Sequence, residues 1–299
     1  MHRRTAPTLA LFFVTSLFGC GDRVTVGGFD GGGGAGGASD GGGGAGGASD
    51  GGGGASSSTA SIDIHFKSTT APFAHADGLA GQTPSVHKSG LRSLTLLRDA
   101  NDPSPFVVFD LGQDSIEIDY ADGADTLVYT AHAADLPAGT FTVARVVHNY
   151  VRYDVAATLH NGALMLAGTF DNLQVLSDAS LVDGTVRDAG YYEYVFHTGG
   201  SSFPTSGSNA PIPEWQSAGG FSVRFENGEW AYYFPVSLPL DPNLAQDASV
   251  TFEVNMHESF RWQDQALTDY ATGVFDVTPT SFEPVMQFGA NSFAVTVDL

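Results

Sequence analysis

The chain has 299 residues, with 12 basic and 33 acidic side chains, a formal net charge of −21 and a single cysteine. So acidic a protein repels phosphate groups, which excludes nucleic acids and anionic lipid surfaces as expected partners. One cysteine excludes a fold held together by disulfides within the chain.

The N-terminus has the pattern of an export signal. Arg3 and Arg4 precede an apolar run over residues 8–18, which is too short to span a bilayer. The run ends in Leu17-Phe18-Gly19-Cys20, which resembles the lipobox of prokaryotic lipoproteins. This resemblance implies that residues 1–19 are a signal peptide and that Cys20 carries the lipid, with more than one acyl chain such as palmitate. We therefore expect a cell-envelope protein, with the outer membrane or the cell surface favoured because Gly21 follows the cysteine.

Residues 20–60 combine the anchor cysteine with a Gly-rich linker. The decapeptide GGGGAGGASD occurs at residues 31–40 and again at residues 41–50. Such a segment has almost no side chain to bury, so we expect a disordered coil with a root-mean-square reach of about 35 Å. It either holds the domain away from the lipid surface or reflects repeat slippage without a selected length.

Residues 61–299 are predicted to form an all-β domain, an antiparallel β-sandwich. Ile62, Ile64 and Phe66 alternate with polar residues at its start, and the same period of two recurs over residues 250–257 and 293–299. No helical period competes with this pattern. Alternating runs punctuated by turns are typical of antiparallel sandwiches of this size.

Four Gly-containing dipeptides predict hairpin turns, because Asn-Gly and Asp-Gly adopt positive φ at low cost. They are Asn227-Gly228, Asn161-Gly162, Asp122-Gly123 and Asp183-Gly184. In the first hairpin, Trp230, Tyr232 and Phe234 are predicted to face the core and Ala231 the solvent. Residues 198–219, rich in Gly, Ser and Pro, are predicted to be one long loop.

Two further resemblances are local. Residues 136–143, LPAGTFTV, are similar to the strand entry of transthyretin-like sandwich modules in bacterial lipoproteins. The order of three segments, at residues 89–103, 136–147 and 191–200, is similar to the methanobactin-associated copper-binding family of periplasmic proteins. That resemblance implies copper bound by histidine and tryptophan, with His197 nearest to the motif. The cysteines and tryptophan pairs of that family have no counterpart here.

Catalytic motifs give no positive signal. His257-Glu258 begins like the zinc-protease motif HExxH, but Arg261 occupies the second histidine position. The pattern GxSxG occurs only inside the Gly-rich repeats, at residues 37–41 and 47–51, where no apolar strand precedes it, so it is not a nucleophile elbow. No Walker loop occurs. We therefore expect a protein that is not an enzyme and needs no cofactor.

Ligand-binding candidates are more numerous. His65, His197 and His257 are candidate metal ligands, although no two histidines have the spacing H-x-H. Glu117, Asp119, Asp122 and Asp125 crowd one predicted hairpin, either as a calcium site or as solvated turn charges. Trp262 beside polar residues is either a sugar-stacking platform or a core residue.

Together these observations predict a lipid-anchored envelope protein whose β-sandwich is a binding or interaction module. The membrane is its partner through the lipid, and its ligand, a glycan or a divalent cation, stays open. The alternatives are a copper-binding periplasmic protein and a carbohydrate-binding or carbohydrate-active surface protein.

Overall fold

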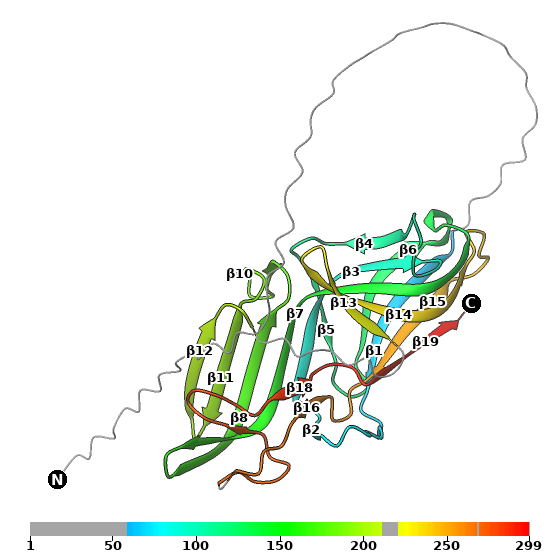
Figure 1. Ribbon diagram of the computed structural model, residues 1–299. Coiled ribbons are helices and arrows are strands. Elements are labelled where there is room, and N and C mark those ends of the chain that lie inside the picture. The colour runs from blue at the N-terminus through cyan, green and yellow to red at the C-terminus, as the bar shows by residue number, and fades with distance from the viewer. Residues whose placement is uncertain (1–58, 211–220, 268, 299) are drawn as a thin grey trace, which may run out of the picture.

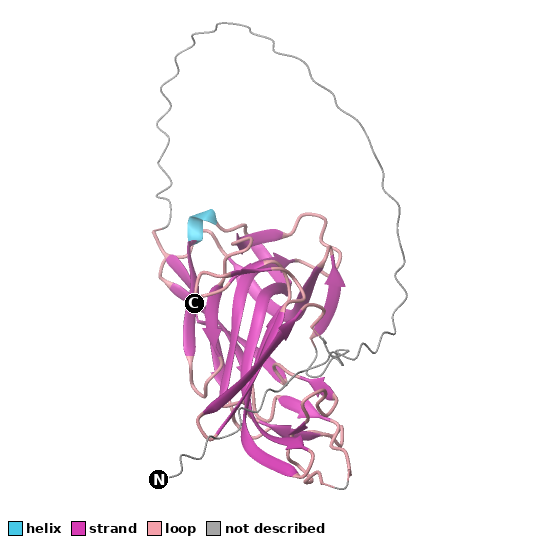
Figure 2. Cartoon of the chain, turned by 90° about the vertical axis from the view of Figure 1, so that its left-hand side faces the viewer, coloured by secondary structure: helices cyan, strands magenta, loops and turns pink. Residues whose placement is uncertain are grey.

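The computed structural model describes residues 59–210, 221–267 and 269–298. The predicted signal peptide, Cys20 and residues 21–58 of the predicted linker lie outside the described residues. Ala60, the last residue of the predicted linker, is buried and accepts a hydrogen bond from the N–H of Ala133. Strands are the dominant regular structure of the described part, which has one helical turn, η1 (Ala133–Asp135), at the top of the folded part in Figure 2. The predicted all-β class is confirmed. No helix in the described part is long and apolar enough to cross a membrane.

A four-stranded sheet forms one layer of the sandwich. Its strands, in spatial order, are β19 (Ser292–Asp298), β15 (Ala248–Asn255), β1 (Ser61–Thr69) and β6 (Asp125–His132). Strict alternation of burial along β1 and β15 confirms the predicted period of two. One detail differs from a purely antiparallel sandwich, because β1 and β15 run parallel, from Ile62 beside Ala248 to Thr69 beside Asn255.

The second layer is a larger sheet built around β7 (Gly139–Asn161), a strand of 23 residues. On one edge of β7 lies β3 (Val86–Leu97), which also pairs with β4 (Phe106–Asp110) and β5 (Ile116–Asp119). Two strands pair with the opposite edge of β7. The first half of β7 pairs with β14 (Glu229–Leu240) and the second half with β8 (Leu164–Val175), so the sheet forks along β7, as Figure 1 shows.

Two branches extend this fork. β13 (Ser222–Glu226) continues beyond β14, while β11 (Tyr192–Thr198) and β12 (Ser201–Gly207) continue beyond β8. A small sheet of three short strands, β18 (Val285–Gln287), β16 (Phe260–Trp262) and β2 (Ala80–Gln82), packs against the second branch. The short strand β17 (Asp276–Val277) pairs in parallel with the end of β7.

The forked sheet creates two apolar cores. In the first, Phe66 and Phe252 of the four-stranded sheet pack against residues such as Phe141 of β7. In the second, Trp262 and Phe275 pack against the far half of β7 and its neighbours β8 and β11. Burial of each large apolar side chain stabilises the fold by about 1.5–3 kcal/mol. Trp262 has no exposed surface, so it is a core residue, and the alternative of a sugar-stacking platform is wrong.

The turn predictions have mixed outcomes. Asn227 (φ 51°) and Gly228 (φ 84°) connect β13 to β14, which confirms this hairpin and the positive φ of both residues. β7 and β8 also form the predicted hairpin, but Asn161 pairs with Leu164, so the turn centres on Gly162 and Ala163. Asp183-Gly184 lies in the connection between β9 (Ala179–Ser180) and β10 (Val186–Arg187), which pair as predicted.

Asp122-Gly123 does not form a hairpin. The strands on either side, β5 and β6, belong to different layers, and the N–H of Gly123 donates to the carbonyl of Ser68 in β1. The dipeptide therefore turns the chain from one sheet to the other. The acidic residues of this region do not form a calcium site, because Glu117 pairs with Lys88 and Asp125 with His65.

Two other expectations need correction. Within the predicted loop at residues 198–219, β12 pairs with β11 around the turn Gly199-Gly200, and residues 211–220 lie outside the described residues. Ala231 has no exposed surface. It shares a face of β14 with Glu229 and Tyr233, whose side chains join an ion-pair layer with Arg145, so this face of the sheet is covered.

Candidate metal centre and the cavity beside it

The three predicted metal ligands are not brought together. In β1, Nδ1 of His65 lies 2.7 Å from a carboxylate oxygen of Asp125. In β11, Nε2 of His197 lies 2.8 Å from Asp171, and Nδ1 lies 2.8 Å from the hydroxyl of Ser202. Both rings are therefore engaged by side chains of their own sheets. His257 has a different environment.

His257 belongs to a cluster with His75 and Glu258. One possible ligand atom from each of these three side chains lies within 4.8 Å of the other two, and all three residues are half-buried. His257 and Glu258 form the turn between β15 and β16, whereas His75 lies in the connection from β1 to β2. His75 could not be linked to His257 from the sequence, because 182 residues separate the two histidines and no local spacing connects them.

The parallel pairing of β1 and β15 explains why these connections meet. Parallel neighbours end at the same edge of a sheet, and the last paired residues are Thr69 and Asn255. Beyond them, the N–H of Met256 donates to the carbonyl of Thr69 at 2.8 Å, and the Asn255 amide donates to the carbonyl of Ala71 at 2.9 Å. The two connections therefore leave the sheet side by side.

Hydrogen bonds orient the two imidazoles. Nε2 of His75 lies 3.3 Å from the backbone carbonyl of His257, so a proton on Nε2 leaves Nδ1 of His75 with a free lone pair. Histidines that bind metals commonly donate their other N–H to a carbonyl in this way. Nδ1 of His257 accepts a long hydrogen bond of 3.3 Å from the N–H of Phe73. An ion bound at this atom has to compete with that hydrogen bond.

The third side chain, Glu258, is held in an unfavourable backbone conformation. Its φ of 47° lies in the left-handed region, which costs a residue with a side chain about 1–2 kcal/mol. Its N–H donates to Oγ1 of Thr83 at 2.8 Å, which fixes the turn. Gly81 lies close by, because a Cβ there would come within 2.6 Å of Arg261 and 3.2 Å of Glu258. Strained residues held by their surroundings often occur at functional sites.

Arg261, a buried residue of β16, contacts both connections that carry the cluster. Its side chain is only 2% exposed, and it forms a two-point ion pair with Asp77 and a contact of 3.7 Å with Glu258. Burial raises the pKa of the Asp77 carboxyl, but hydrogen bonds from Arg261 and from the backbone of Leu79 outweigh it, so the pKa lies below its ordinary value. Asn291 adds a second support by donating to the carbonyl of His257.

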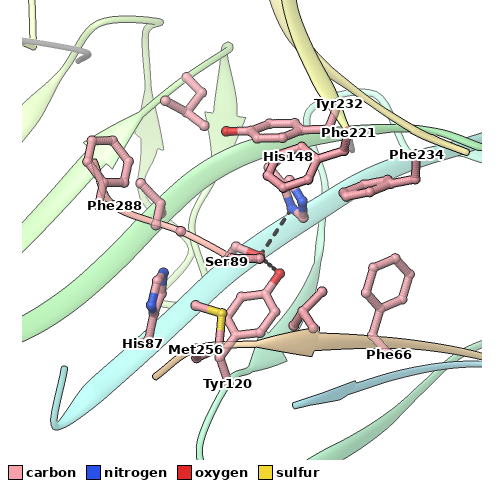
Figure 3. Close-up of a pocket in the computed structure, with 15 residues that line it drawn as sticks. Phe66, His87, Ser89, Tyr120, His148, Phe221, Tyr232, Phe234, Met256 and Phe288 are labelled. Atoms are coloured by element: carbon pink, nitrogen blue, oxygen red, sulfur yellow. Dashed lines mark hydrogen bonds between the residues drawn. The ribbon is translucent and has the colours of Figure 1, made fainter. Parts of the chain in front are cut away.

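A cavity of about 60 Å³ lies between the two layers of the sandwich, and its lining does not include the three residues of the cluster. Met256, the residue before His257, contributes to its wall together with Phe66, Phe234 and Phe288 (Figure 3). Its lining draws on both layers and both cores.

Polar groups on the cavity wall form a short chain. The hydroxyl of Ser89 lies 2.8 Å from the hydroxyl of Tyr120 and 3.1 Å from Nδ1 of His148, as the dashed lines in Figure 3 show. Burial, together with the nearby His148, lowers the pKa of His87 to about 3, and burial lowers that of His148 to about 4. Burial raises the pKa of Tyr120 to about 12. All three groups are therefore neutral near pH 7.

Comparison with known proteins gives no family for this chain. No family model matches it, and neither a curated protein nor a solved structure matches it.

Proposed function

We propose that this protein is a lipid-anchored, non-catalytic protein of the cell envelope that binds a divalent transition-metal ion through His75, His257 and Glu258. The convergence of these three side chains from two distant connections carries the proposal. The proposal names a ligand class, transition-metal ions, for the binding module expected from the sequence. Of the three histidines predicted as metal ligands, it keeps His257.

The donor set favours late first-row transition metals. Two imidazoles and one carboxylate match the ligands that hold Zn²⁺ with an open position, and imidazole also suits Cu²⁺. Ca²⁺ and Mg²⁺ prefer sites made only of oxygen. Ligand atoms around a tetrahedral Zn²⁺ lie about 3.4 Å apart. Since the three ligand atoms lie within 4.8 Å of one another, they need to close by no more than about 1.4 Å.

The low pKa values of the two histidines in the neighbouring cavity support a binding role over a catalytic one. A general base works best when its pKa lies near the working pH. His87 and His148 have pKa values of about 3 and about 4, so they are poor bases at neutral pH. Hydrogen bonding to Ser89 holds His148 as part of a structural network.

Titration calorimetry with Zn²⁺ and Cu²⁺, and with Ca²⁺ for comparison, tests the proposal on the purified protein. We expect one Zn²⁺ per chain and weaker binding of Ca²⁺. His75→Ala, His257→Ala and Glu258→Gln should each lower the Zn²⁺ affinity at least about tenfold. His65→Ala is the matched control, because His65 is paired with Asp125 in the four-stranded sheet. Unchanged Zn²⁺ binding by both His75→Ala and His257→Ala would contradict the proposal.

A further inference from the structure

A second, polar cleft lies on the outer face of the forked sheet, on the side opposite the second core. Its volume is about 210 Å³. Its floor consists of side chains from β7, β8 and β11, and the β9–β10 hairpin contributes Asp183, Thr185 and Arg187 to its wall. In Figure 1, β10 lies at the upper end of these strands. The cleft shares no lining residue with the cavity beside the metal centre.

Strand register places opposite charges on the floor of the cleft. Arg152 of β7 is paired with Leu173 of β8, which is paired in turn with Glu193 of β11. In the next row Asp171 of β8 is paired with Val195 of β11. Each row runs across the sheet on one face, so a basic group, acidic groups and a strip of apolar surface lie together.

The two arginines of the cleft form no close ion pair with a carboxylate, although Arg152 acts on Asp154 and Arg187 on Asp183 at longer range. Most basic side chains in the described residues form ion pairs with acids, namely Lys67, Lys88, Arg92, Arg98, Arg145 and Arg261. Within the described residues, Arg152 and Arg187 form none. The guanidinium of Arg187 lies 4.6 Å from the centre of the Tyr191 ring, and its buried Nε has no hydrogen-bond partner.

Arginines without a close ion pair are unexpected in this protein, because its 33 acidic side chains greatly outnumber its 12 basic ones. Basic groups without a close acidic partner in such a protein call for an explanation. An anionic group of a ligand, held by the two guanidiniums, supplies the missing partner, because the guanidinium fork matches a carboxylate.

The acidic residues of the cleft have spare acceptor capacity. Oε2 of Glu193 accepts from the hydroxyl of Tyr191 at 2.8 Å, and Oδ2 of Asp171 lies 2.8 Å from His197. Oδ1 of Asp183 accepts from the N–H and hydroxyl of Thr185. Since each carboxylate has a second oxygen, these groups can accept further hydrogen bonds from a cationic donor.

We propose that this cleft binds a small zwitterion, a free α-amino acid, with its carboxylate on Arg152 and Arg187 and its ammonium group on Glu193 and Asp183. A ligand with one sign of charge meets repulsion from half of the lining, whereas a zwitterion satisfies both halves. The apolar strip of Leu173 and Val195 is available to the ligand's side chain. This site is independent of the proposed metal centre.

Titration calorimetry of the full-length protein with each of the common amino acids tests this proposal. We expect at least one amino acid to bind with one ligand per chain. Its two single-charge analogues, lacking the amino or the carboxyl group, should bind at least tenfold more weakly; for leucine these are 4-methylpentanoate and 3-methylbutylamine. Arg152→Gln and Arg187→Gln should each weaken binding at least tenfold.

Arg224→Gln is the matched control, because the Arg224 guanidinium also lies over an aromatic ring, that of Tyr233 at 4.4 Å, but outside the cleft. This variant should bind like the parent. His257→Ala should also bind the amino acid like the parent, which separates this result from that of the metal centre. The proposal is overturned if no amino acid binds, if the analogue lacking the amino group binds equally well, or if both arginine variants in the cleft bind like the parent.

Discussion

Arg261 and Asp77 form a two-point ion pair that joins residues 184 positions apart in the sequence, with Nε of Arg261 2.9 Å from Oδ2 of Asp77. The pair fastens the connection after β1 to strand β16. Because the same arginine contacts Glu258, it holds both halves of the proposed metal centre in register.

The first prediction concerns this arginine. Arg261→Met should lower the free energy of unfolding by about 2 kcal/mol, because the hydrogen bonds of the guanidinium to Asp77 and to the carbonyl of Leu79 are lost. It should also weaken Zn²⁺ binding, because Glu258 loses its support. Chemical denaturation measures the first effect and calorimetry the second. Lys67→Met is the control, because its pair with Glu253 is about 40% exposed on both sides and contributes little. Equal stability of the two variants would refute the prediction.

The second prediction concerns the β13–β14 hairpin. Nothing lies within 4 Å of a Cβ placed on Gly228, so Gly228→Val should cost only the strain of its positive φ, about 1–2 kcal/mol. Ala231→Thr should also destabilise the protein, by about 1–3 kcal/mol, because Ala231 is fully buried. Ser237→Thr, at an exposed position of β14, should be nearly neutral. If urea denaturation ranks Ser237→Thr with the other two variants, the packing described for β14 is incorrect.

The third prediction is a loss of stability in acid. The folded protein holds the pKa of His87 at about 3 and that of His148 at about 4, below the value of about 6.5 for an unfolded chain. Between those values the unfolded state binds more protons. Stability should therefore be constant above about pH 7 and fall as the pH drops from about 6.5 toward 4, by up to about 1.4 kcal/mol per pH unit for each histidine.

Denaturation curves measured from pH 7.5 to pH 4.5 check this dependence. His87→Phe should flatten the slope by about half, and the exposed His132 provides the control His132→Gln, which should keep the parent slope. A parent protein whose stability does not change over this range would rule out neutral burial of the two histidines.

The fourth prediction concerns the anchor. Cys20→Ser should move the protein from the membrane fraction to the soluble fraction, because the acyl chains expected on Cys20 supply the membrane affinity. Detergent partitioning and immunoblotting of cell fractions measure this shift. The proposed zinc and amino-acid sites should be unaffected, since they lie in the described domain. Membrane association that persists in the variant would disprove the anchor assignment.

The sequence by itself determined the all-β class, the buried face of β1 and β15, and the turn between β13 and β14. Ile62, Ile64 and Phe66 could be assigned to the core because a period of two is a local property of a half-buried strand. Asn227-Gly228 could be placed in a turn because positive φ is a property of the residues themselves. Each of these features depends on interactions between near neighbours in the chain.

Only the tertiary structure decided which segments meet. The parallel pairing of β1 with β15 brings His75 to His257, and the fork along β7 separates two cores and leaves a cleft with Arg152 and Arg187 on its outer face. Likewise, Asp122-Gly123 looks like a hairpin turn but joins two layers. Strand order and register follow from the packing of the whole domain, because a hydrophobic alternation specifies a buried face without specifying its partner.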